Sequence, residues 1–150
     1  MMHLLPRLAK AFPFLHKRPV TEADLHGHCR EHNVKVIFDP DISKGVFVVW
    51  QGKQHIWLND KLRGWPLLYV FAHEVAHSIF HAPSQLNTGV EFFGLHNKKK
   101  NHFEAEAAAA FLLLPIPDLE HALLDGLHSN SSEIAGVIAM RLDLHKKYGV

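Results

Sequence analysis

The sequence lacks the features that define several common classes of protein. Its 150 residues contain one cysteine, Cys29, which excludes an internal disulfide and any zinc site built from several cysteines. No apolar run approaches the ~18 residues of a membrane span, so we expect no membrane-embedded segment. Neither sign of charge dominates, since 16 Lys and Arg accompany 15 Asp and Glu. That balance argues against direct nucleic-acid binding or an acidic membrane surface as the main partner.

The first twenty residues also lack acidic side chains. They carry four basic residues, and prolines and charges interrupt any uncharged stretch that could serve as a secretory signal (Pro6, Arg7, Lys10, Pro13, Lys17 and Arg18). We therefore expect residues 1–20 to form a basic arm or a short helix lying on a single domain formed by residues 21–150. Without a signal, and with a lone thiol, we expect the protein to be cytoplasmic.

The first half of the chain predicts one helix followed by a small sheet. Thr21 precedes Asp24 by three residues, a helix-start pattern, and the helix is expected to end near residue 31 or 32. Runs rich in β-branched and aromatic residues follow at 34–38, 46–50 and 56–58, with a turn at 51–54. These runs predict a small, mostly antiparallel sheet.

The second half predicts helices. Apolar residues at helical spacings from Pro66 to Phe80 indicate a largely buried helix, followed by a polar loop over residues 84–101 that contains the run Lys98–Lys100. Further helices are expected at 102–114, at 117–124 and from residue 131 or 132 onward. No linker divides the chain, so the fold class predicted is a single α+β domain.

Histidine is the residue present in excess, with 14 copies. The buried helix contains His73-Glu74-Val75-Ala76-His77, an H-E-x-x-H motif for which only roughly 0.07 chance occurrences are expected at this composition. Histidines four residues apart share one helix face, so both imidazoles can bind one metal ion. The glutamate between them can accept a proton from a water molecule activated by that ion.

A zinc site that keeps a position for water needs a third protein ligand. His81 is excluded as a partner of His73 because the two lie ~12 Å apart along a continuous helix, whereas zinc–nitrogen bonds are ~2 Å. Three roles remain open for His81: it supports a metal ligand, faces the substrate or only packs against its neighbours. Glu104 and Glu106 on the next helix are better candidates, and since they differ by about 200° around its axis only one can face the metal.

These two motifs together resemble the ImmA/IrrE family of metallopeptidases. The segment 68–77 is similar to that family's active-site helix, and 104–115 to its second motif, a Glu-Ala pair before Asn or Asp, a Phe-Ala pair and Leu-Leu-x-Pro. Aligned from Pro115, the resemblance places the family's ligand glutamate on Glu104 and its Asn or Asp on Glu106. The chain departs from the pattern at Glu106 and at Ala108, where Phe is usual. The resemblance covers roughly residues 34–142.

The resemblance implies a zincin-like fold of the gluzincin type, with zinc (Zn2+) on His73, His77 and Glu104 and with Glu74 as the general base. It also implies proteolytic inactivation of a helix-turn-helix transcriptional repressor in a phage, mobile-element or stress-response switch. No such DNA-binding unit is clear in this sequence, so the repressor would be a separate protein. Two alternatives remain: a binding module that sequesters the repressor around a structural zinc, and a peptidase of broad specificity.

Other polar residues have roles that the sequence leaves unassigned. The Lys98–Lys100 run is either a solvated charged segment or a docking site for an acidic substrate or for DNA that carries the repressor. Four histidines could stabilise the oxyanion of a cleavage reaction (His81, His96, His102 and His145). Cys29 has neighbouring histidines but no third group to organise them, so we do not expect it to be a nucleophile.

Overall fold

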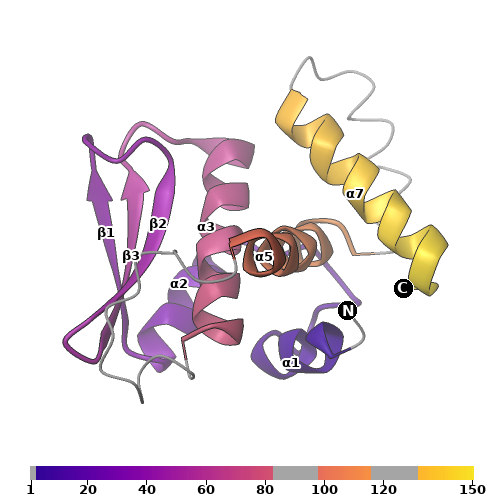
Figure 1. Ribbon diagram of the computed structural model, residues 1–150, viewed down its shortest axis with the longest axis horizontal. Coiled ribbons are helices and arrows are strands. Elements are labelled where there is room, and N and C mark those ends of the chain that lie inside the picture. The colour runs from indigo at the N-terminus through magenta and orange to yellow at the C-terminus, as the bar shows by residue number, and fades with distance from the viewer. Residues whose placement is uncertain (1–2, 83–97, 116–131) are drawn as a thin grey trace.

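The computed structural model describes residues 3–82, 98–115 and 132–150, which form five helices and a three-stranded sheet (Figure 1). The helices are α1 (Leu4–Ala11), α2 (Glu22–Glu31), α3 (Gly64–Phe80), α5 (Lys98–Leu113) and α7 (Ser132–Tyr148). The strands are β1 (Val34–Asp39), β2 (Gly45–Trp50) and β3 (Lys53–Asn59). The predicted α+β class is confirmed. None of the described helices has the length and hydropathy needed to cross a membrane.

The sheet differs from the prediction in one pairing. Its strand order is β1-β3-β2, with β2 and β3 forming the expected antiparallel hairpin and β1 pairing parallel to β3. The hairpin turns at Gln51 and Gly52, both with positive φ. The chain reverses direction after β1, and β2 lies one strand position away from β1. β3 then pairs with both strands in the position between them. The sheet is therefore mixed, and the prediction of a mostly antiparallel sheet is wrong in this detail.

Helix boundaries follow local sequence signals where those signals are strong. The Thr21 hydroxyl accepts a hydrogen bond from the backbone N–H of Asp24, whose carboxylate accepts one from the N–H of Thr21, so the predicted capping box starts α2. The prediction that residues 98–101 are part of a loop is wrong, because α5 already begins at Lys98. Lysine is a good helix former, and no Gly or Pro interrupts residues 98–101. The remainder of that loop and the predicted helix at 117–124 lie outside the described residues.

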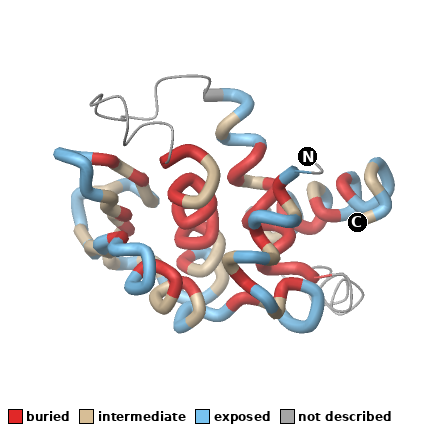
Figure 2. Tube along the Cα trace, turned by 90° about the horizontal axis from the view of Figure 1, so that it is seen from below, coloured by how far each residue is buried: buried red, intermediate tan, exposed pale blue. Residues whose placement is uncertain are grey.

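Helix α3 occupies the centre of the molecule, with the sheet on one side and α5 on the other (Figure 1). Figure 2 shows the buried residues concentrated in this middle region and the exposed ones toward the periphery. The inner face of the sheet contributes alternating residues to the core, and α5 contributes five fully buried alanines (Phe47, Val49, Ile56, Leu58; Ala105, Ala107, Ala108, Ala109, Ala110). Helix α1 adds Leu4 and Leu8, which are also fully buried.

Strand β2 approaches α3 closely at Gly45. A Cβ atom built at this position would lie 2.5 Å from Cγ1 of Val70 and 3.2 Å from Cγ of Glu74. The first separation is too short for a Cβ unless Val70 moves, so the absence of a side chain allows the edge strand to contact the helix beside Glu74. The sheet and the motif helix are thereby held together at the motif itself.

A buried arginine joins the C-terminal end of α5 to α7. Arg141 is only 1% exposed; its Nε donates to the backbone oxygen of Leu114 at 2.9 Å and its Nη1 to that of Val150 at 2.6 Å. Its guanidinium carbon lies 4.5 Å from the ring centroid of Phe111. The last carbonyls of a helix lack partners within the helix, so Arg141 satisfies one of them just beyond α5 while it anchors α7.

Replacing this arginine should destabilise the fold. Arg141→Met keeps much of the aliphatic volume but leaves the Leu114 carbonyl without its buried donor, so we expect the free energy of unfolding to fall by about 2–4 kcal/mol. Urea denaturation followed by circular dichroism measures the change. Arg30→Met is the matched control, because Arg30 is exposed on α2. Equal stabilities of the two variants would contradict a structural role for Arg141.

Candidate metallopeptidase site

The two histidines of the motif face each other on α3. The Nε2 atoms of His73 and His77 are 3.1 Å apart, and both side chains are buried. Two nitrogen ligands of one tetrahedral zinc ion, each bonded at 2.0–2.1 Å, would lie ~3.3 Å apart. The observed spacing therefore fits two ligands of a single metal ion.

A third histidine joins this pair from α5. In the part of the chain that the structure describes, His73, His77 and His102 form a group whose ligand atoms all lie within 4.8 Å of one another. From the sequence, His102 was a candidate only for stabilising the oxyanion. Its one available signal was its position two residues before Glu104, on the helix expected to supply the third ligand. We call these three residues the histidine triad.

Glu104 lies beside the triad but is not a member of it. Its side chain is buried, and its Oε2 is 3.2 Å from Nε2 of His81. Its Oε1 is 3.6 Å from Nε2 of His3 and 3.9 Å from Nζ of Lys100. Glu106, the other acid considered, is half-buried on the same helix. The structure thus connects Glu104 to the site through His81.

His81 follows the last residue of α3 and is buried. As expected from helix geometry, it does not join the triad; instead its Nδ1 lies 2.9 Å from Nδ1 of His77. Each of its two ring nitrogens therefore contacts a different residue of the site, His77 from α3 and Glu104 from α5. Of the other two histidines considered for the oxyanion, His145 lies on α7, with its Nδ1 3.0 Å from the backbone oxygen of Val150, and His96 falls outside the described residues.

Glu74, the residue expected to act as the base, is buried on α3. Burial raises the pKa of its carboxyl group to about 8, although a hydrogen bond from the backbone N–H of Phe47 acts in the opposite direction. A carboxyl group with a pKa near neutrality can both accept and donate a proton at physiological pH. The edge strand β2 therefore helps to orient the side chain on which the predicted chemistry depends.

Burial keeps the motif histidines neutral. Together with the neighbouring histidines, it lowers the pKa of His73 to about 4 and that of His77 to about 2. The pKa of His81 is also lowered by burial, with Glu104 opposing the shift. Neutral imidazole is the form that binds metal, so these side chains need lose no proton to do so near pH 7.

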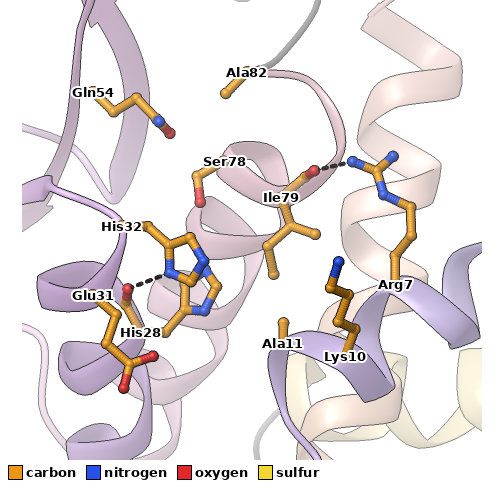
Figure 3. A pocket seen from close by; sticks show the side chains of 10 residues that line it. All are labelled: Arg7, Lys10, Ala11, His28, Glu31, His32, Gln54, Ser78, Ile79 and Ala82. Carbon is orange, nitrogen blue, oxygen red and sulfur yellow. Dashed lines mark hydrogen bonds between the residues drawn. The ribbon is translucent and has the colours of Figure 1, made fainter.

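Two features outside the triad do not contribute to it. Burial raises the pKa of the Cys29 thiol to about 12, which agrees with the expectation that it is not a nucleophile. A cavity of about 460 Å³ opens between α1, α2 and the end of α3, with Arg7, His28 and Ser78 in its wall (Figure 3). None of the predicted site residues lines it, so it is separate from the triad.

Comparison with known families agrees with this geometry. Residues 29–150 match the family model described as the IrrE N-terminal-like domain, Peptidase_M78, which covers α3, α5 and the whole histidine triad. No curated protein matches the chain. The family is one of metallopeptidases, and the triad could bind a metal ion. The chain therefore belongs to the ImmA/IrrE family of metallopeptidases.

Proposed function

We propose that the protein is a zinc-dependent endopeptidase that inactivates a helix-turn-helix transcriptional repressor in the cytoplasm. The observation that carries the proposal is the buried pair of Nε2 atoms 3.1 Å apart on α3, with Glu74 between their residues in sequence. Imidazole ligands at tetrahedral spacing suit zinc. The repressor as substrate is supported by the resemblance of both motifs to the ImmA/IrrE family.

When bound, zinc would supply Lewis acidity, which polarises a carbonyl group and lowers the pKa of a water molecule. The chain supplies the proton transfers. Glu74 accepts a proton from the attacking water and delivers it to the nitrogen of the leaving amine, so that the carboxyl group returns to its starting state. The hydrogen bond from the Phe47 N–H holds the carboxyl group in one orientation during both transfers.

The third zinc ligand in this proposal is Glu104, as the family resemblance implies. Glu104 is only 9% exposed, and a carboxylate so buried needs positive charge nearby. The ammonium of Lys100 at 3.9 Å is a distant, solvent-exposed partner for it. His102 lies nearer to the motif histidines and is the competing donor. Both side chains come from α5, so this helix completes the ligand set in either case.

Glu74→Gln should abolish cleavage while zinc stays bound. The substitution preserves the size of the side chain and leaves the proposed zinc ligands in place. Because the amide cannot accept the proton, the rate of repressor cleavage should fall by ~10²–10⁴. Cleavage is measured by electrophoresis and mass spectrometry, and zinc by elemental analysis. Glu31→Gln, on the exposed part of α2, should behave like the parent. Relief of repression by Glu74→Gln at the parental level would instead support the sequestering module.

Glu74→Gln should also stabilise the metal-free protein, by an amount that depends on pH. The pKa of Glu74 is about 8 in the folded state and near 4.5 when unfolded, so the unfolded chain releases its proton first as the pH rises. Stability is thus lost between pH 4.5 and 8, by at most ~1.4 kcal/mol per pH unit. Urea unfolding should show the advantage of Glu74→Gln growing from pH 5 to pH 7.5. A gain in the free energy of unfolding that does not change with pH would contradict the raised pKa of Glu74 as its cause.

Alanine substitutions on α5 identify the third ligand. We expect Glu104→Ala to lose zinc, because two remaining ligands rarely retain the ion, whereas Glu106→Ala should keep it. His102→Ala should also keep it if Glu104 is the ligand. Elemental analysis after dialysis against a weak chelator makes the comparison. Zinc retained by Glu104→Ala but lost by His102→Ala would transfer the ligand role to His102.

A further inference from the structure

We propose that His81 is a positioning residue, which fixes the tautomer of His77 and connects it by hydrogen bonds to Glu104. The proposal rests on the proposed zinc site but not on which α5 side chain completes it. Two contacts define the connection: Nδ1 of His77 to Nδ1 of His81 at 2.9 Å, and Nε2 of His81 to Oε2 of Glu104 at 3.2 Å.

The direction of each hydrogen bond follows from the chemistry of its end group. A carboxylate oxygen only accepts, so the proton of the second contact belongs to Nε2 of His81. A neutral imidazole carries one N–H, which leaves Nδ1 of His81 as an acceptor. The proton of the first contact therefore belongs to Nδ1 of His77. The Nε2 of His77, 3.1 Å from Nε2 of His73, is then unprotonated, so its lone pair accepts from His73 in the metal-free protein and can bind a metal ion instead.

That arrangement is the one a metal ligand requires. A histidine binds a metal through one nitrogen, and a hydrogen bond donated by the other nitrogen fixes the ring and its tautomer. His81 receives this bond in a buried setting: His77, His81 and Glu104 are all less than one-tenth exposed. Water therefore competes little for these polar atoms, and each hydrogen bond is stronger than it would be at the surface.

The connection also spans two helices. His77 lies on α3, and His81 is the first residue after that helix. Glu104 lies on α5, more than twenty residues farther along the chain. A side chain that bonds to both holds the motif histidine and the glutamate in a fixed relation before any metal binds. Among the described residues, His73 has no equivalent support, because its buried Nδ1 has no hydrogen-bond partner.

The test compares His81→Phe with His81→Gln. Phenylalanine fills a similar space without polar atoms, whereas glutamine can accept from His77 through its oxygen and donate to Glu104 through its amide. We expect the zinc dissociation constant, measured by competition with a chromophoric chelator, to rise ~10–100-fold in His81→Phe and to recover substantially in His81→Gln. His145→Phe, an exposed position on α7, is the control.

A second measurement needs neither metal nor activity. Nitrogen-15 NMR of the metal-free protein, labelled at histidine, reports the tautomer of each ring. We expect His77 to be protonated at Nδ1 in the parent and in His81→Gln, and to show mixed tautomers in His81→Phe. Circular dichroism establishes that each variant is folded. If His81→Phe does not fold, the tautomer of His77 in the parent and in the folded His81→Gln variant tests the proposal.

The proposal is overturned if His77 in the parent is protonated at Nε2, or if folded His81→Phe keeps both the tautomer and the zinc affinity of the parent. Weaker zinc binding with an unchanged tautomer also overturns it, because it would show only a packing role. These outcomes are independent of catalysis. An active Glu74→Gln variant would end the peptidase proposal and leave the tautomer result intact.

Discussion

Close packing between α3 and α5 is the constraint on which the site depends. Helix α5 presents five fully buried alanines, and α3 contributes the buried Ala72 and Ala76. Small side chains let two helix axes approach, so groups projecting from both helices can meet over one small volume. The histidine triad and the contact from Glu104 to His81 both bridge these two helices. A larger side chain among the alanines would therefore disturb the site without touching any of its residues.

Much of the local structure was predictable because short-range rules determine it. The capping box at Thr21 and the helical apolar spacing of α3 depend on neighbours within a few residues, and both predictions are confirmed. The motif histidines belong to the same class, because positions four apart on a helix share a face. The spacing of His73 and His77 follows from secondary structure alone, and the group that these two residues form with His102 does not include His81.

The contacts between segments that are distant in the sequence could not be predicted. Alternation along β1 indicates which of its faces is buried but not which strand lies beside it, so the parallel pairing with β3 was missed. The position of His102 beside the motif pair depends on the rotation of α5 against α3, which no local pattern encodes. The two hydrogen-bond contacts of His81 likewise become visible only when both helices are placed.

The close approach at Gly45 has a further consequence for Glu74. A glutamate side chain in water samples many rotamers. Restricting it to one rotamer costs up to ~2 kcal/mol in conformational entropy, and a reaction that needs that rotamer must meet this cost. Here β2 packs against the side chain and the Phe47 N–H fixes its carboxyl group as the domain folds. The loss of entropy is therefore part of folding, and in the proposed reaction it would not add to the activation barrier of the proton transfer. Under that mechanism, a missing methyl group on an edge strand, far from the motif in sequence, would contribute to the rate.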